Sequence, residues 1–338
     1  NFAFIDNYTN RLQSIGVEVI YKPYTSSLEE HLIEFGERYN LILIARVNTF
    51  EFCIDNINKY CPSAKIFFHT VDLHFLRTER QAKLEKSEKL LKQSEDLKKI
   101  EIDCMRKADV TSVISPEELK LMKSITSELN LQLMPLMRTI KSSGECFNDR
   151  KDILFIGGFS HTPNIDAVKF FSQEVMPLLR NNIKGIKFYI VGSNAPKEVL
   201  DLESDDVIIL GFVEKIIPLM NKIKISVAPL RYGAGIKGKI GSAMAAGLPV
   251  ISTQIAAEGM NAINNENFLL ANTPEDFCKQ IHELYFNKEL WEKISINGLK
   301  LAKQNFGKEN GYKHLLKILS SINISIDEPK HPLKLYEE

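Results

Sequence analysis

Short apolar runs alternate with helix-length segments along this chain, in two successive series. The first series comprises runs at residues 2–5, 17–21, 41–45, 66–69 and 108–114. The second comprises runs at residues 153–156, 187–191, 207–210, 225–228 and 250–252. Such alternation favours parallel sheets covered by helices on both faces. The sequence therefore predicts an α/β protein with two doubly wound, Rossmann-like domains.

Helices are expected between these runs and after the last one. They are expected at residues 28–39, 50–60, 163–179, 274–286, 290–304 and 308–319, with one long charged helix between 74 and 107. Ser115 followed by Pro116 predicts a further helix start. Serine caps a helix N-terminus, and proline fits the first helical position.

A polar segment at residues 138–150 lacks any hydrophobic period and indicates an interdomain linker. We expect a first domain over residues 1–140 and a second over 151–306. A final helix and tail over 307–338 could return to the first domain. Sheets of this kind bind ligands beyond the carboxyl ends of their strands. Two such sheets facing each other would form a central cleft.

The composition argues against several classes of protein. The 338 residues carry no formal net charge, whereas a nucleic-acid-binding protein usually has a basic excess. Five widely spaced cysteines form no Cys-x-x-Cys pair, which favours reduced thiols over a zinc site or disulfide framework. No apolar run approaches the roughly 18 residues of a membrane span, and no signal-peptide pattern is present. The chain opens with Asn1 rather than Met, so we expect it to be part of a longer polypeptide.

Lysines recur every three residues within the expected charged helix, at Lys83, Lys86, Lys89 and Lys92. A solvated helix face is the preferred interpretation of this pattern. The alternative is a basic patch that contacts a membrane surface peripherally.

The strongest ligand signal is the segment Arg231-Tyr-Gly-Ala-Gly-Ile-Lys-Gly-Lys239, which leads into an Ala-rich helix. Gly235 and its neighbouring glycines let the backbone approach a ligand closely. The helix N-terminus presents free N–H groups to an anion. Lys237 and Lys239 add positive charge at the same place. The segment therefore suits a phosphate or diphosphate.

Glycines also follow three successive strands of the second half. Gly157 and Gly158 follow the first strand, Gly192 the second, and Gly211-Phe212-Val213 the third. An ordinary turn explains the first pair as well as a ligand does. Three in series exceed what turn chemistry usually requires.

In combination, these segments resemble the donor half of GT-B glycosyltransferases. The resemblance is strongest to glycosyltransferase family 4, in the branch that serves bacterial surface polysaccharides. Phe67-Phe-His-Thr-Val-Asp-Leu-His-Phe-Leu-Arg77 is similar to the acceptor-side segment of that branch, as are residues 109–115 and Glu118. The resemblance spans nearly the whole chain.

This resemblance implies a GT-B architecture with a first, acceptor-side domain and a second domain for the nucleotide-sugar donor. It implies a retaining hexosyltransferase or related enzyme (EC 2.4 class) that needs no metal or other cofactor. The acceptor would be a glycan or a lipid-linked molecule, and the reaction would be cytoplasmic.

The resemblance also implies roles for individual residues. The catalytic residues would be His69, Lys237 and Lys239. The donor would be bound by Gly157, Gly158, Gly192, Phe212, Val213, Gly235, Ser242 and Glu258. The acceptor side would include Asp72, His74, Arg77, His161 and Asn164. In these roles the two lysines neutralise the leaving diphosphate, and His69 contacts the donor sugar. A purely structural histidine is the alternative for His69.

The chain departs from the family pattern at two places. The family usually carries two glutamates eight positions apart, of which the second binds the donor ribose; Ala234 and Ser242 stand there in this chain. A serine keeps a hydrogen bond but loses a charge-assisted one, on the order of 1–3 kcal/mol, and Glu258 could compensate. In addition, residues 1–24 resemble the second strand–loop–helix unit of the family, so the first is expected to be missing.

Two other readings remain open from the sequence. The chain could be a non-catalytic GT-B binding or scaffolding module of a larger multidomain protein. It could also perform another GT-B chemistry, such as sugar-nucleotide epimerisation or phosphorolysis.

Overall fold

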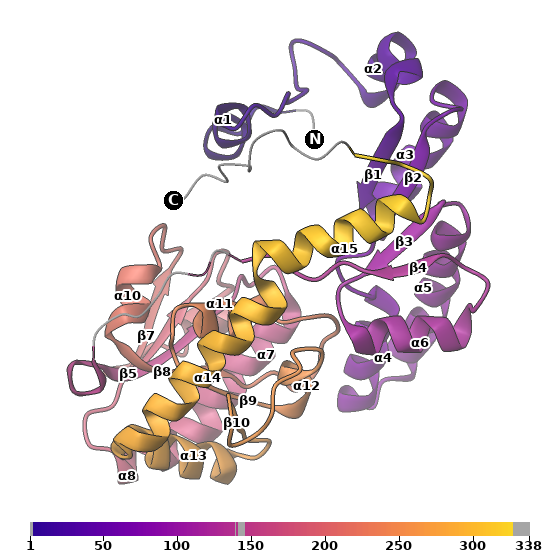
Figure 1. Ribbon diagram of the computed structural model, residues 1–338. Coiled ribbons are helices and arrows are strands. Elements are labelled where there is room, and N and C mark those ends of the chain that lie inside the picture. Colours follow the sequence, from indigo (N-terminus) through magenta and orange to yellow (C-terminus); the bar gives the residue numbers. More distant parts are fainter. Residues whose placement is uncertain (1–2, 139, 141–145, 327–338) are drawn as a thin grey trace.

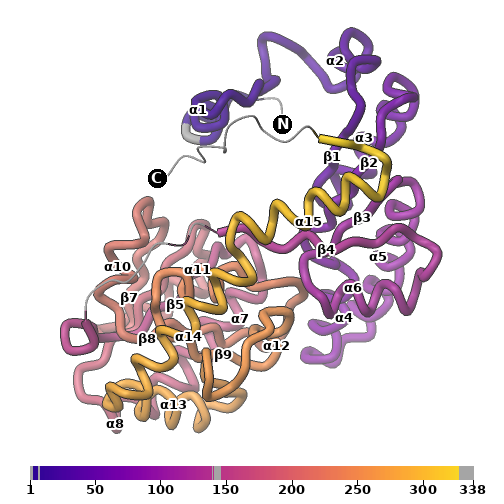
Figure 2. Tube along the Cα trace, viewed as in Figure 1, coloured from indigo at the N-terminus to yellow at the C-terminus, as the bar shows by residue number. Residues whose placement is uncertain are grey.

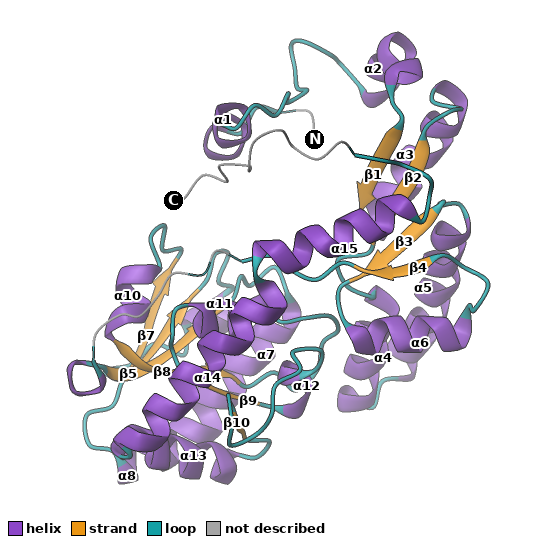
Figure 3. Ribbon diagram, viewed as in Figure 1, coloured by secondary structure: helices purple, strands orange, loops and turns teal. Residues whose placement is uncertain are grey.

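The computed structural model describes residues 3–138, 140 and 146–326. Two α/β units follow one another along the chain, each built on a parallel sheet with helices packed against it (Figure 1 and Figure 3). We call residues 3–138 the first unit and residues 146–306 the second unit. The fold class expected from the sequence is confirmed.

The first unit contains a four-stranded parallel sheet in the order β1-β2-β3-β4. Its strands are β1 (Leu41–Ala45), β2 (Lys65–His69), β3 (Val110–Val113) and β4 (Leu131–Leu133). Its helices are α1 (Asp6–Ser14), α2 (Leu28–Phe35), the short 3-10 helix η1 (Gly36–Arg38), α3 (Val47–Tyr60), α4 (His74–Glu85), α5 (Glu88–Arg106) and α6 (Pro116–Ile125). Helix α6 begins as predicted, because the Ser115 side chain accepts a hydrogen bond from the Glu118 backbone N–H and Pro116 opens the helix.

The charged segment at 74–107 forms two helices rather than one. Lys86, which follows α4, has a φ of 51° and so adopts the left-handed conformation. Ser87 then caps α5 by accepting a hydrogen bond from the Leu90 N–H. The break at Lys86 turns the chain back, and α5 packs along α4 as an antiparallel partner (Figure 1).

The expected strands at 2–5 and 17–21 are wrong for the residues that the structure describes. Residues 3–5 and 17–21 are irregular, and α1 lies between them. A strand requires a hydrogen-bonded neighbour, but within the described ranges β1 pairs with β2 alone. The apolar side chains of this segment stay exposed: Phe4, Ile5, Tyr8, Leu12, Ile15 and Val17.

The second unit contains a six-stranded parallel sheet in the order β10-β9-β8-β5-β6-β7. Its strands are β5 (Lys151–Ile156), β6 (Phe188–Val191), β7 (Val207–Gly211), β8 (Ile223–Ala228), β9 (Val250–Ser252) and β10 (Leu269–Leu270). Its helical elements are η2 (Phe147–Asp149), α7 (Thr162–Phe170), η3 (Phe171–Val175), α8 (Met176–Asn182), α9 (Lys197–Leu200), α10 (Ile217–Lys222), α11 (Gly238–Ala245), α12 (Gln254–Ala257), α13 (Pro274–Phe286) and α14 (Lys288–Phe306). Every residue of β8 is buried, as expected for a central strand covered on both faces.

The segment expected as one helix at 163–179 is interrupted by a wider, π-helical turn, η3. Pro177 follows this turn and has no N–H with which to continue the regular bonding pattern. Aromatic rings fill the core beneath it. The Phe171 and Phe188 ring centroids are 4.4 Å apart, and Phe277 packs edge-on against Phe171.

The C-terminal helix α15 (Lys308–Ser320) leaves the second unit and runs across to the first (Figure 2). Ile318 and Ile322 form a small buried cluster with Phe67 of β2 and Val110 of β3. The Asn130 side chain adds a 3.0 Å hydrogen bond to the Ser321 hydroxyl. The end of the chain therefore completes one face of the first sheet.

Part of the expected linker at 138–150 lies outside the described residues, namely 139 and 141–145. The described end of this segment is anchored rather than loose. The buried Arg150 guanidinium donates 3.0 Å hydrogen bonds to the carbonyl oxygens of Met220 and Ile223. Across the ranges that the structure covers, no helix is both long and apolar enough to traverse a membrane.

Candidate functional site

A cavity of about 510 Å³ lies between the two units, beyond the carboxyl ends of their strands. The first unit lines it with Arg46, Val71, Asp72, Arg77, Ile114 and Leu136. The second unit lines it with Gly158, Ser160, His161, Asn164, Ser193, Leu230, Ala234, Ile236, Lys237, Gly238 and Lys239. Four of these side chains are lysine or arginine and one is a carboxylate, so the cavity favours an anionic ligand.

Lys239 lies in the first turn of α11 with its ammonium held among neutral groups. Its Nζ atom donates to the side-chain oxygen of Asn164 and lies 4.2 Å from the centroid of the Phe155 ring. Part of the stem remains exposed, but the ammonium itself is enclosed. Burial, and to a lesser extent the charge of Lys237, lower the pKa of Lys239 to about 7. A bound anion would restore the charged form.

Lys237 occupies the N-cap position of α11 and is 6% exposed. Its Nζ donates to the carbonyl oxygens of Ala234, at 2.9 Å, and Gly235, at 2.6 Å. Burial lowers the pKa of Lys237 to about 8, against the opposing effect of the carboxylates of Glu258 and Glu118. The structure thus brings both predicted lysines to one end of the cavity.

The glycines predicted to admit a ligand serve different purposes. A Cβ atom on Gly192 would lie 2.1 Å from the Gly157 carbonyl oxygen, so this glycine is required by the packing of two strand ends. A Cβ atom on Gly157 would lie 2.8 Å from Lys239 Nζ. At Gly158 the nearest atom to an added Cβ is the Ser193 hydroxyl oxygen, 3.6 Å away, and this residue lines the cavity.

Gly235 lies where the loop passes the first unit. Its φ of +66° is a left-handed conformation, and an added Cβ would lie 2.9 Å from Ile114 Cδ1. Two independent requirements, backbone conformation and space, therefore select glycine here.

The acceptor-side residues of the first unit are largely paired with one another. Arg77 donates to Asp72, and His74 Nε2 lies 3.5 Å from Asp72 Oδ1. Burial would raise the pKa of Asp72, but the nearby His74 ring and the charge of Arg77 outweigh it and hold the pKa below its usual value. Asp72 and Arg77 line the cavity, whereas His74 lies behind them.

His161 and Asn164 are the acceptor-side residues predicted in the second unit, and both line the same cavity. Burial lowers the pKa of His161 to about 4, with Arg77 adding to the effect, so this ring is neutral at neutral pH. The buried Asn164 also donates from Nδ2 to the Gly158 carbonyl oxygen at 2.7 Å. Asn164 therefore ties the Gly157-Gly158 loop to Lys239.

His69 lies at the carboxyl end of β2, and its Nδ1 is 2.8 Å from the Ser112 hydroxyl. Burial lowers the pKa of His69, and the positive charge of Arg46 lowers it further. Val71 and Asp72, just beyond the strand, line the cavity, but His69 does not. A role for His69 would require a ligand that reaches past these residues.

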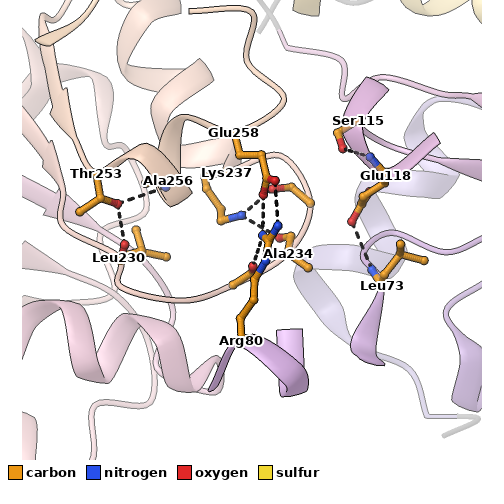
Figure 4. A network of polar contacts seen from close by, with 12 residues as sticks. Leu73, Arg80, Ser115, Glu118, Leu230, Ala234, Lys237, Thr253, Ala256 and Glu258 are labelled. Atoms are coloured by element: carbon orange, nitrogen blue, oxygen red, sulfur yellow. Dashed lines mark hydrogen bonds and ion pairs between the residues drawn. The ribbon is translucent and has the colours of Figure 1, made fainter. Parts of the chain in front are cut away.

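Seven of the eight predicted donor-binding residues do not line the cavity, namely Gly157, Gly192, Gly235, Phe212, Val213, Ser242 and Glu258. Phe212 is 73% exposed in the loop after β7, beside Val213. Ser242 is half-buried on α11. Glu258 follows α12 and forms an ion pair with Arg80 of α4 (Figure 4).

Sequence reasoning missed Arg46 and Arg80. Arg46 lines the cavity with a φ of 72°, an uncommon value for a residue with a side chain. Its position directly after β1 was a usable signal, because ligand sites gather at strand ends. Arg80 lies three residues after Arg77, which helical spacing would have grouped with it. Its partner Glu258 is 178 positions away, and no sequence pattern indicates that pairing.

The second unit matches a known family. Residues 150–287 match the family model described as "Glycosyl transferases group 1". The whole chain resembles solved structures of similar architecture. Anabaena HepE in complex with UDP-glucose has a TM-score of 0.70 and 15% identity, covering 95% of this chain and 90% of that one.

The chain has the GT-B fold. A second similar structure is S. aureus TarM in complex with Fondaparinux, alpha-GlcNAc-glycerol and UDP. It has a TM-score of 0.69 and 16% identity, covering 87% of this chain and 59% of that one. The family match covers the second unit, and the likeness in fold extends over both units.

A relative in Klebsiella pneumoniae is described as an "Uncharacterized 44.6 kDa protein in cps region". It is 24% identical over 175 residues, which is 49% of this chain and 45% of that protein. The matched part thus spans less than half of the length of that relative.

Proposed function

We propose that this chain is a retaining glycosyltransferase of the family 4 type, in the branch that serves surface polysaccharides. It transfers a hexose or related sugar from a nucleotide-sugar donor to a glycan or lipid-linked acceptor. The observation that carries the proposal is the Lys237–Lys239 pair at the interdomain cavity. Lys239 is hydrogen-bonded to a neutral amide, and no ion pair joins it to a carboxylate in the described part of the chain. A donor diphosphate is a suitable counter-charge.

In the proposed reaction the bond between the anomeric carbon and the diphosphate oxygen breaks, and its electron pair goes to the diphosphate. A bond forms between the acceptor oxygen and the anomeric carbon on the same face of the sugar, and the acceptor hydroxyl passes its proton to the departing diphosphate oxygen. Lys237 and Lys239 stabilise the negative charge that develops on the leaving group. We propose that these two ammonium groups supply that charge with no metal ion or other cofactor.

The other site residues take roles around this centre. Gly158 leaves room for the diphosphate, as an added Cβ there would face the cavity. Asp72, Arg77 and His161 would form the acceptor side, and all three line the cavity. His69 would contact the donor sugar after the ligand has entered. Phe212 and Val213 would border the base, and Ser242 would reach the ribose after local rearrangement, because the Glu258 carboxylate is held by Arg80.

Similar proteins support the proposed donor and the proposed link to surface polysaccharides. The HepE structure contains UDP-glucose, and the TarM structure contains UDP and a GlcNAc derivative. The Klebsiella relative lies in a cps region. We propose a cytoplasmic reaction, with peripheral membrane contact if the acceptor is lipid-linked.

The proposal is tested by calorimetry with UDP-, GDP- and dTDP-sugars, followed by a transfer assay with the donor that binds. Lys239→Gln should abolish or greatly weaken binding, whereas Lys184→Gln removes a positive charge from an exposed position and should not. Absence of binding for all three donors, with no effect of Lys239→Gln on any transfer, would refute the proposal.

A second candidate is a non-catalytic binding or scaffolding module of a larger protein. It is favoured by one observation, that neither Ser242 nor Glu258 lines the cavity. Sugar transfer that is lost in both His69→Ala and Lys239→Ala would exclude this second candidate. Donor binding without transfer to any tested acceptor would favour it.

A further inference from the structure

An ion pair joins the two units next to the proposed donor site. Arg80 of α4 makes a two-pronged contact with Glu258, in which Nη2 lies 2.7 Å from Oε1 and Nη1 donates to Oε2 (Figure 4). Arg80 Nη1 also donates to the Gly233 carbonyl oxygen at 2.7 Å. Neither Arg80 nor Glu258 lines the cavity. Their contact is therefore behind the ligand site and not in it.

The same loop carries Lys237. Three consecutive carbonyl oxygens are divided between the two cations: that of Gly233 accepts from Arg80, and those of Ala234 and Gly235 accept from Lys237. Gly233 and Gly235 both have positive φ, so this loop conformation depends on its tethers as well as on its glycines. Arg80 of the first unit and the Lys237 ammonium are thus connected through the backbone of one short loop, to which both donate hydrogen bonds.

Glu258 also bears on the charge of Lys237. Among the neighbouring charges, that of Glu258 raises the pKa of Lys237 the most, against the lowering effect of burial, and Arg80 acts in the opposite direction. A carboxylate released from Arg80 would be a ready partner for Lys237, because opposite charges attract strongly where water is scarce. Such a pair would compete with a phosphate for the lysine.

We propose that Arg80 is a positioning residue for the donor site, which holds Glu258 and Gly233 so that the Lys237 ammonium remains available to an anion. This inference rests on the proposed function, since the anion is the donor diphosphate. Arg80 belongs to the first unit and Lys237 to the second. The strength of donor binding therefore depends on contact between the two units.

The test measures UDP-glucose affinity of the full chain by calorimetry, for Arg80→Met, Glu258→Gln and the double variant. Arg80→Met should weaken binding by about tenfold or more, equivalent to about 1.4 kcal/mol, because Glu258 is then free to pair with Lys237. The double variant removes that competing carboxylate and should recover most of the affinity. Lys83→Met, which removes an exposed charge from the same helix, is the matched control and should bind normally.

Recovery in the double variant is the decisive outcome. If Arg80 contacted the donor directly, or if the ion pair were only a mechanical link between units, removing Glu258 as well would not help. A double variant as weak as Arg80→Met, or Arg80→Met with unchanged affinity, would overturn the inference.

Hydrogen exchange separates this inference from the proposed function. Backbone amides at 234–238 should exchange faster in Arg80→Met than in the unchanged chain, without any nucleotide present, because the Gly233 tether is gone. If no nucleotide sugar binds to the unchanged chain but exchange still rises, the proposed function fails and the positioning contact stands. Unchanged exchange in a variant with a normal thermal unfolding profile would reject the contact itself.

Discussion

The two walls of the interdomain cavity hold their charges in different ways. On the second-unit wall, the lysines are bonded to neutral partners: Lys239 to an amide and Lys237 to two backbone carbonyls. On the first-unit wall, Asp72 is paired with Arg77 and lies beside His74. Among the described residues, the first wall thus has one cation, Arg77, that is neutralised by Asp72 and one, Arg46, that has no ion pair, while on the second wall neither lysine has an ion-pair partner. The difference indicates which wall would receive a diphosphate and which would orient a neutral hydroxyl.

The largest expected effect comes from Lys239→Gln on the second wall. Loss of one group that stabilises developing charge typically lowers kcat by about 10²–10³-fold, and we expect a loss of transfer activity in that range. Transfer rates at saturating donor would measure it. Lys184→Gln is the matched control, and a Lys239→Gln enzyme with near-normal kcat would remove the proposed distinction between the walls.

The next prediction compares two glycines of the second unit, one required by packing and one that leaves room for a ligand. Gly192→Ala should reduce the free energy of unfolding by about 1–3 kcal/mol, because its Cβ would overlap the Gly157 carbonyl oxygen. Gly158→Ala meets only the Ser193 hydroxyl at 3.6 Å, so its stability should change little while donor affinity falls. Urea unfolding and calorimetry on both variants would measure the two quantities. Equal stability losses would show that both glycines are structural.

The strand–helix alternation of the second unit could be predicted from the sequence because strands such as β5, β6 and β7 contain continuous apolar runs. Its Gly-Lys segment could be predicted as an anion site for local reasons, since glycine, helix start and lysine lie within nine residues. The cap at Ser115 is equally local. The roles assigned to individual site residues remain predictions.

The remaining features depend on contacts that no local pattern records. The left-handed conformation of Lys86 divides the charged helix, yet lysine is not a residue that marks such a break. The run at 17–21 has strand-like composition but no neighbouring strand in the described residues. Glu258 was assigned to ribose binding, whereas its carboxylate is held by Arg80 of the other unit. Only the docking of the two units brings that pair together.

The pH dependence of donor binding should follow the charge of the two lysines on the second wall. The pKa of Lys239 is lowered to about 7 and that of Lys237 to about 8, so both lose their charge as pH rises through this range. Affinity for UDP-glucose should therefore fall by up to about tenfold per pH unit as pH rises above the pKa, while its phosphates keep their charge. Calorimetry between about pH 6 and about pH 9 would measure this. In Lys239→Gln the binding that remains should depend on the charge of Lys237, so the fall in affinity should move to higher pH.

Glu118 titrates over the same pH range as the two lysines, so its contribution to the pH dependence must be measured separately. Burial raises its pKa to about 7, so it gains negative charge near Lys237 over the same range. Glu118→Gln removes this contribution, and the profile should keep most of its slope. A donor affinity that does not change with pH in Glu118→Gln would show that Glu118 of the first unit causes the pH dependence. It would contradict the role given to the lysines of the second wall.

The smallest expected effect has the opposite sign and comes from the first wall. Asp72→Asn removes the one carboxylate that lines the cavity, and with it a negative charge that would repel the diphosphate. UDP-glucose should bind about two- to threefold tighter, as expected for one charge acting over a distance in a partly solvated site, while transfer to the acceptor falls. Calorimetry and transfer rates on the same preparation would show whether the two effects diverge. If Asp72→Asn instead weakened donor binding as much as Lys239→Gln, the two walls would share one role, because a residue that only orients the acceptor cannot be required to hold the diphosphate.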